Sequence, residues 1–416
     1  MGSSDVWSRI GRYARICWAA LVLFGAGGAM ATETPNTLNA RFQAFLVELR
    51  VEALRRGVPA AVFDRATAGL TPDPHVLALA AAQPEHVKAP RDYLEAIVTD
   101  ERIEAGRAQF ATLGETLRAI ENAYGVDRHV VIALWGVETN YGGAMGEYGV
   151  VRSLSTLAVE DGRRATFWRS ELLAALRILE RGDIDPERMT GSWAGAMGHT
   201  QFMPSTYVAH AVDFDGDGRR NIWGSAPDAL ASAASYLRAS GWRRSEPWGL
   251  EVTLPQGFDY ALSAPDRAQP PAAWERLGVG PPAGAKWPKS QSDLQLVLPA
   301  GARGPAFLVT PNFRALLSYN PALTYAVAVG HLADRIAGGA PIMGPWPMDD
   351  MPLDRPEREE LQQRLVQRGF DTGGIDGIIG DRTRDAIRTF QRGRQLPEDG
   401  HPSLNLLERL RHEAGG

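Results

Sequence analysis

Residues 129–143, HVVIALWGVETNYGG, combine a nearly all-apolar run with a carboxylate, Glu138, close to its end. Apolar residues fall on every side of this run, which predicts a buried helix over 128–141. A carboxylate at a helix C-terminus faces the negative end of the macrodipole, and apolar neighbours add desolvation. Both effects raise the pKa of a Glu. Glu138 is therefore either a candidate general acid or a Glu with a structural hydrogen-bond partner.

Helical periodicity continues over most of the chain on both sides of this run. From Leu38 to about Ala123, apolar residues recur at helical spacing, beginning with Phe42, Phe45, Leu46, Leu49 and Val51. Further helices are predicted at 166–179, 226–240 and 325–336. Residues 245–310 are instead rich in Pro and Gly, with β-like runs at 250–254, 294–298 and 306–310. We predict a mainly α (α+β) fold with a small β-containing insert at about 245–310.

The two ends of the chain have their own signatures. Three arginines precede the apolar run 16–29, which closes on Ala29-Met-Ala31, as in a signal peptide (1–31) cleaved after Ala31. The run is shorter than the roughly 20 residues of a membrane span. The only cysteine, Cys17, lies in this segment and does not follow a lipoprotein pattern. A periplasmic location without disulfides is expected, and the net charge of −5 argues against nucleic acid as a partner.

Towards the C-terminus, GGAPIMGPWPMDDMP (338–352) is aperiodic and rich in Pro and Gly, which predicts a linker over 338–353. It separates a main domain, 32–337, from a compact module, 354–416. Leu361, Leu365 and Val366 form an apolar stripe in the module. A helix starting at 381–383 is predicted to carry Ala386, Ile387 and Phe390.

A second informative stretch is GSWAGAMGHTQFMPSTY (191–207). Its small residues indicate either backbone brought close to a ligand or a tight packing contact between two helices. Ser192 and Gln201 would offer neutral donors and acceptors, the groups that recognise sugar hydroxyls and acetamides.

The segment DFDGDGRRNIW (213–223) resembles a calcium-binding loop. Asp213, Asp215, Asp217 and Gly218 match positions 1, 3, 5 and 6 of an EF-hand loop, and Arg219 would supply its main-chain carbonyl. The twelfth position is Gly224 and not Glu, so a solvated Asp/Gly turn is the alternative. We predict a weak, structural Ca²⁺ site.

Several of these motifs together resemble one family. WGVETNYGGAMGEYGVVRSLSTLA, DGRRATFW and the run from GSWAGAMG to GDGRRNIW are similar to the lytic murein transglycosylases of the B family, over roughly 42–336. Residues 354–416 resemble the three-helix peptidoglycan-binding domain. The resemblance implies a lysozyme-like helical catalytic core with the β-containing insert and a C-terminal peptidoglycan-binding module.

The resemblance also implies roles for particular residues. Glu138 would be catalytic, and Asp228 would close the calcium site from a longer loop. Residues implied to contact the substrate are Ser192, Gln201, Arg163, Arg164, Phe202, Tyr141, Tyr236, Tyr319 and Tyr325. Core packing is the alternative for the tyrosines.

The reaction implied is cleavage of the MurNAc–GlcNAc bond of peptidoglycan without water, forming 1,6-anhydroMurNAc. Glu138 would act as acid and then as base, so neither a second carboxylate nor a cofactor is required for the chemistry. Two alternatives are a lysozyme-like hydrolase and a non-catalytic wall-binding scaffold. The expected partners are glycan strands, with wall-synthesis or division complexes as candidates, and the chain is expected to be a monomer.

Overall fold

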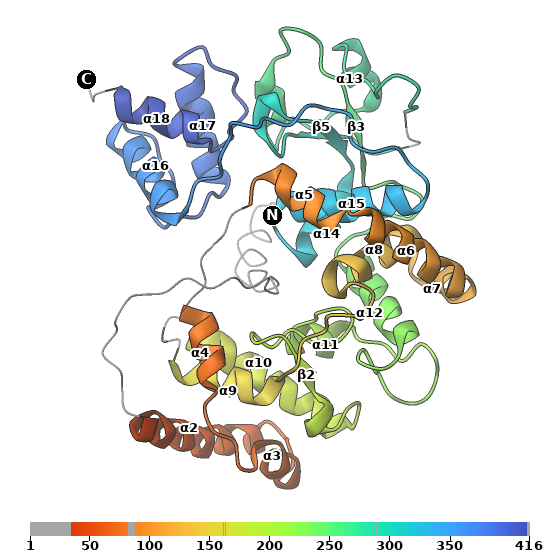
Figure 1. Cartoon of the computed structure of the whole chain (residues 1–416), viewed down its shortest axis with the longest axis vertical. Coiled ribbons are helices and arrows are strands. Elements are labelled where there is room, and N and C mark those ends of the chain that lie inside the picture. The colour runs from red at the N-terminus through yellow and green to blue at the C-terminus, as the bar shows by residue number, and fades with distance from the viewer. Residues whose placement is uncertain (1–34, 82–87, 161, 163, 288–289, 414–416) are drawn as a thin grey trace, which may run out of the picture. The chain divides into compact units, whose positions relative to one another are not determined.

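The structure is a computed structural model that describes residues 35–81, 88–160, 162, 164–287 and 290–413 (Figure 1). As predicted, it is mainly helical, with two small antiparallel sheets. The chain divides into two compact units, residues 1–83 with 105–239 and residues 84–104 with 240–416. The predicted signal peptide lies outside the described residues. Among those that are described, no helix has the length and apolar character needed to cross a bilayer.

The first unit is built from helices and one short antiparallel strand pair. Its strands are β1 (Tyr148–Gly149) and β2 (Thr190–Gly191). Its helices are α2 (Pro35–Arg55), α3 (Ala60–Thr67), α4 (Pro74–Ala81), α7 (Gly114–Tyr124), α8 (Arg128–Thr139), α9 (Val150–Glu160), α10 (Ala165–Arg181), η1 (Pro186–Arg188), α11 (Pro204–His210) and α12 (Ala226–Ala239). Helix α6 (Asp100–Thr112) crosses the sequence boundary between the two units.

Helix α8 is the buried helix that the opening stretch predicts. Asp127 caps its N-terminus by accepting a hydrogen bond from the His129 backbone N–H at 2.7 Å. Residues 130–136 are all buried, as expected for a helix that is apolar on every side. The helix ends at Thr139, two residues earlier than predicted, because Asn140 and Tyr141 adopt left-handed backbone conformations with φ of 49° and 58°.

The predicted apolar stripe of α2 is partly wrong. Phe42, Leu46, Leu49 and Ala53 are buried, whereas Val51 is 48% exposed. The buried positions follow steps of three and four residues along the helix, and Val51 falls outside that stripe.

The second unit contains the predicted insert and the module. Three of the predicted β-like runs become β3 (Gly249–Val252), β4 (Gln295–Val297) and β5 (Ala306–Val309), which form an antiparallel sheet in the order β3-β5-β4. The fully buried Trp274 lies in the core beside this sheet. The other elements outside the module are α5 (Pro90–Ile97), η2 (Tyr260–Ser263), α13 (Pro271–Arg276), η3 (Gly301–Arg303), α14 (Pro311–Tyr319) and α15 (Leu323–Ile336).

The module has the three helices implied by the resemblance: α16 (Arg355–Gln367), α17 (Asp381–Arg392) and α18 (Leu404–His412) (Figure 1). Asp354 and Glu357 form a capping box at the start of α16. The predicted start of α17 is confirmed, and its Ile387 and Phe390 are buried with Leu361 and Leu365 of α16. Val366 was wrongly predicted to join them. It is 44% exposed because one helical step turns it about 100° away from Leu365.

Candidate active site

Glu138 is half-buried in the last turn of α8. The chain then turns back, so that the Tyr141 ring lies across this turn. A Cβ placed on Gly136 would be 2.6 Å from the Tyr141 hydroxyl, so only glycine leaves room for the ring. The Tyr141 ring also meets Trp135 edge to face, with 5.7 Å between centroids. Tyr141 is thereby held beside the helical turn that presents Glu138.

Hydrogen bonds join the end of α8 to the segment around Gln201. The Trp135 indole N–H donates to Nδ1 of His199 at 3.0 Å, and the Thr139 hydroxyl donates to the His199 carbonyl at 3.1 Å. Burial lowers the pKa of His199, which favours its neutral form. Since Nδ1 accepts, the proton of the neutral ring is assigned to Nε2. Sequence reasoning missed Trp135, Thr139 and His199, because none of them stands out from an ordinary core residue in the sequence.

Ser192 and Gln201 lie in one compact loop that directly follows β2. The Ser192 hydroxyl accepts a hydrogen bond from the Ala196 backbone N–H at 3.0 Å. The Gln201 side-chain amide donates to the carbonyls of Met145 (3.1 Å) and Gly198 (2.9 Å), and Gln201 is only 4% exposed. Gln201 therefore ties its loop to the chain that follows α8.

The glycines of this loop serve close packing of the chain on itself. A Cβ on Gly191 would be 2.1 Å from the Ala196 carbonyl oxygen, and one on Gly198 would be 2.5 Å from that of Ile222. Of the two alternatives for this small-residue stretch, the structure shows the packing contact at both positions. The contact is between loop backbones and not between two helices.

The other predicted substrate residues are distributed over both units. Phe202 is buried and its ring is 5.8 Å from that of Tyr236 on α12. The Arg164 guanidinium lies 4.6 Å from the Trp168 ring, whereas Arg163 is outside the described residues. Tyr319 and Tyr325 belong to the second unit, at the end of α14 and the start of α15, and are buried. Their burial agrees with core packing, and a substrate role for them stays a prediction.

Other carboxylates of the first unit are exposed, ion-paired or hydrogen-bonded to backbone, and none of the three described next stands out as a second catalytic group. Glu147 is exposed, and Glu160 forms an ion pair with Arg41 at 3.1 Å. Glu171 is 4% exposed, and burial raises its pKa. Its two oxygens accept hydrogen bonds from the backbone N–H (2.9 Å) and the hydroxyl (2.8 Å) of Ser205. Glu171 therefore satisfies donors in the first turn of α11.

A carboxylate cluster forms where the calcium loop is predicted. Side-chain oxygens of Asp213, Asp215, Asp217 and Asp228 all lie within 4.8 Å of one another. Asp228 is fully buried in the first turn of α12, and its oxygens accept from the backbone N–H groups of Phe214 and Asn221, both at 2.7 Å. Burial raises the pKa of Asp228.

Four ionised carboxylates this close repel one another, and a cation between them would relieve that repulsion. All-oxygen ligands suit a hard cation such as Ca²⁺. The residues present therefore fit the predicted metal. The carbonyl of Arg219 stays a predicted ligand; the Arg219 N–H donates to Asp217 at 2.8 Å.

Comparison with known families agrees with this architecture. Residues 41–334 match the family described as "Transglycosylase SLT domain", and residues 354–410 match the "Putative peptidoglycan binding domain". The chain belongs to the SLT transglycosylase family and is a lytic transglycosylase with a C-terminal peptidoglycan-binding domain.

Particular relatives narrow the similarity further. The structure of SltB3 from Pseudomonas aeruginosa, solved in complex with NAG-anhNAM-pentapeptide, has 50% sequence identity and a TM-score of 0.85, covering 89% of this chain and 99% of that chain. Membrane-bound lytic murein transglycosylase B of Escherichia coli is 32% identical over 252 residues, 59% of this chain and 66% of that protein, just under two thirds. Escherichia coli Slt35, solved in complex with calcium, has 27% identity and a TM-score of 0.57, covering 74% of this chain and 98% of that chain.

Proposed function

We propose that the chain cleaves the MurNAc–GlcNAc bond of peptidoglycan without water and forms 1,6-anhydroMurNAc ends, with Glu138 as acid and then base. The observation that carries this proposal is the position of Glu138 at the end of a buried helix locked to the Ser192–Gln201 loop through Trp135, Thr139 and His199. The similarity to SltB3, which has been crystallised with NAG-anhNAM-pentapeptide, supports an anhydro product.

The proposed chemistry needs one titrating carboxyl group. Protonated Glu138 donates its proton to the glycosidic oxygen as the bond from C1 to that oxygen breaks, and the GlcNAc 4-hydroxyl leaves. The 2-acetamido group of MurNAc stabilises the positive charge at C1. The Glu138 carboxylate then removes the proton of the C6 hydroxyl, and the C6 oxygen bonds to C1. Glu138 is thus returned to its protonated form, and water is not consumed.

The neighbouring side chains would orient the sugar. Ser192 is half-buried and carries a hydroxyl that can bind the acetamido group. Gln201 would act through its amide oxygen, because its nitrogen already donates to Met145 and Gly198. Tyr141 and Tyr236 would supply aromatic surface for the sugar rings, and the buried Phe202 would support the Tyr236 ring. Arg164 would be a further polar contact.

The test is digestion of purified sacculi, with soluble products identified by mass spectrometry before and after borohydride reduction. We expect products one water lighter than hydrolysis products and unchanged by borohydride. Reducible products would instead indicate a hydrolase, and sacculus binding with no release would indicate a scaffold.

Substitution of the proposed acid provides the matching control. Glu138→Gln removes the titrating proton and leaves the side chain nearly the same shape. Turnover should fall by about 10²–10⁴-fold or more, since that range is the usual contribution of a general acid. Sacculus binding should stay unchanged. Glu147→Gln, which changes an exposed carboxylate nearby in the sequence, should retain wild-type activity. Substantial cleavage by Glu138→Gln would refute the assignment.

Metal binding, export, the binding partner and the oligomeric state also belong to this proposal. Asp213, Asp215, Asp217 and Asp228 would hold a structural Ca²⁺, which would tie the loop to α12 and take no part in the chemistry. The N-terminal 31 residues would direct export to the periplasm and be removed, which N-terminal sequencing of the cell-purified protein would test. Glycan strands are the proposed partner, and the protein would work as a monomer.

A further inference from the structure

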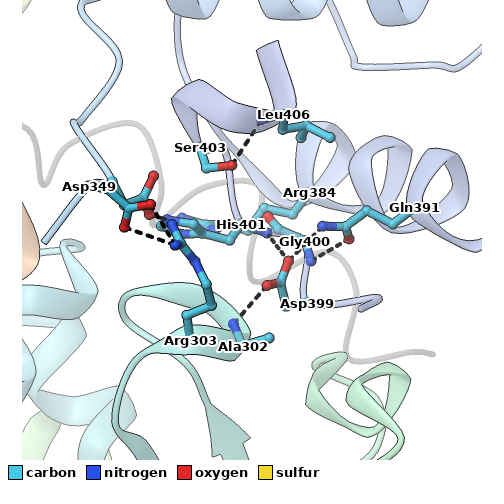
Figure 2. Close-up of polar contacts among 11 residues, drawn as sticks. Ala302, Arg303, Asp349, Arg384, Gln391, Asp399, Gly400, His401, Ser403 and Leu406 are labelled. Carbon is cyan, nitrogen blue, oxygen red and sulfur yellow. Dashed lines mark hydrogen bonds and ion pairs between the residues drawn. The ribbon is translucent and has the colours of Figure 1, made fainter. Parts of the chain in front are cut away.

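A loop of the C-terminal module meets a turn of the β-containing insert through one shared carboxylate (Figure 2). Asp399 Oδ2 accepts a hydrogen bond from the backbone N–H of Ala302 in the insert at 2.7 Å. Its Oδ1 accepts from the Gln391 side chain (2.7 Å) and the His401 backbone N–H (2.9 Å) within the module. The same group that organises the module's loop therefore also binds the insert.

Two further polar contacts flank this one, and both use aspartates at the end of the 338–352 stretch. Arg303 of the insert contacts both oxygens of Asp349, at 2.8 and 2.9 Å (Figure 2). His401 Nε2 lies 2.7 Å from Asp350, whose side chain is only 8% exposed. The insert, the connecting stretch and the module are thus joined at one place.

The backbones fit closely at this place. Gly301 has a φ of +67°, which favours glycine. A Cβ on Gly301 would be 2.8 Å from Asp399 Oδ2 and 2.9 Å from the Cβ of His401. Any larger residue would therefore press on the module's loop.

The stretch 338–352 is itself anchored, although its composition predicts a linker. The Glu251 side chain on β3 accepts hydrogen bonds from the backbone N–H groups of Met343 and Gly344. Pro352 forms a β-bridge with Ser403 of the module. Chain that is anchored at its middle and at its C-terminal end in this way does not behave as a free coil.

We propose that these contacts form a docking joint that holds the peptidoglycan-binding module in one orientation on the insert. The joint consists of Gly301, Ala302, Arg303, Asp349, Asp350, Asp399 and His401. The short connection keeps the two surfaces at an effective concentration in the millimolar range, so even a modest set of contacts keeps the joint closed. The module would then act as an orienting arm, and it would bind the cell wall through surfaces other than the 399–401 loop.

The orientation can be measured with a pair of spin labels. The chain's only cysteine lies at position 17, so the form that starts at residue 32 has none. Glu275→Cys on α13 and Glu408→Cys on α18 change exposed residues of the insert and the module. Double electron–electron resonance spectroscopy then measures the distribution of distances between the two spin labels. A free coil with the length of 338–352 would spread its ends over a span on the order of 20 Å.

We expect one narrow distance peak for the wild-type joint and a broad distribution for Gly301→Ala. Gly257→Ala is the matched control, because Gly257 is also left-handed (φ +74°) but has open space around its Cβ position. It should keep the narrow peak. Arg303→Ser removes a half-exposed side chain outside the core and should broaden the peak without unfolding either part.

Sacculus binding separates an opened joint from a misfolded module, and it should be retained in all three variants. A broad distribution for the wild type, or a narrow peak for both Gly301→Ala and Arg303→Ser, would overturn the proposal.

Discussion

The hydrogen bond between Trp135 and His199 predicts an unusual effect of replacing the histidine. Trp135 is 6% exposed, and its indole N–H has Nδ1 of His199 as acceptor at 3.0 Å. A protonated imidazole has no lone pair and cannot accept this bond. Asparagine can place its side-chain oxygen near the position of Nδ1 and does not titrate. His199→Asn should therefore preserve the bond and remove its dependence on pH.

The sign of the effect follows from burial, which lowers the pKa of His199 in the folded chain. The unfolded chain therefore binds this proton at a higher pH than the folded chain. The stability that neutral His199 contributes is fully present above the ordinary histidine pKa of about 6.5 and is lost as the pH falls towards the lower folded value. For one proton the slope is at most about 1.4 kcal/mol per pH unit.

A second variant separates the hydrogen bond from the charge. His199→Leu leaves the buried indole N–H without an acceptor, which costs about 1–3 kcal/mol at every pH. His199→Asn should be close to wild type at about pH 8 and more stable than wild type at about pH 5.

The assay is urea unfolding of wild type and both variants across this pH range, with the difference in free energy of unfolding plotted against pH. His210 and His331 also have lowered pKa values, but they are present in all three proteins and cancel in the difference. A difference between His199→Asn and wild type that does not change with pH would refute the titration argument. Equal stability of the Leu and Asn variants would show that the Trp135 hydrogen bond contributes nothing.

Two other outcomes are expected from packing and from metal binding. Gly330→Ala on α15 would place a Cβ 2.3 Å from the Trp248 ring and should destabilise the chain by about 3 kcal/mol, whereas Gly114→Ala, with open space at the start of α7, should be neutral or stabilising by up to about 1 kcal/mol. Equal urea midpoints for the two would contradict the packing. Calcium at about ten times its Kd should stabilise the wild type by about 1.4 kcal/mol, and Asp217→Asn should reduce this gain. Calorimetric melting that is identical in Ca²⁺ and in EDTA would exclude the site.

Local sequence patterns correctly predicted features that depend on a single helix or strand. The apolar run before Glu138 predicted α8, and the three β-like runs of the insert became β3, β4 and β5. The same patterns misplaced Val51 and Val366, because an apolar residue on a helix does not reveal which neighbours cover it. The helix end was predicted late, because Asn140 and Tyr141 leave the helix when Tyr141 packs back over Gly136.

The class of fold, the two family domains, the carboxyl group at the end of α8 and three of the four clustered aspartates could all be predicted from the residues alone. These features depend on spacing within short segments, where helical period and loop motifs are readable. Three contacts were found only in the folded chain: His199 accepts from Trp135, the loop glycines pack against backbone, and Asp399 accepts from the Ala302 N–H. Most of those contacts join residues distant in the sequence, and the energy of each depends on burial and distance, which exist only after the chain has folded.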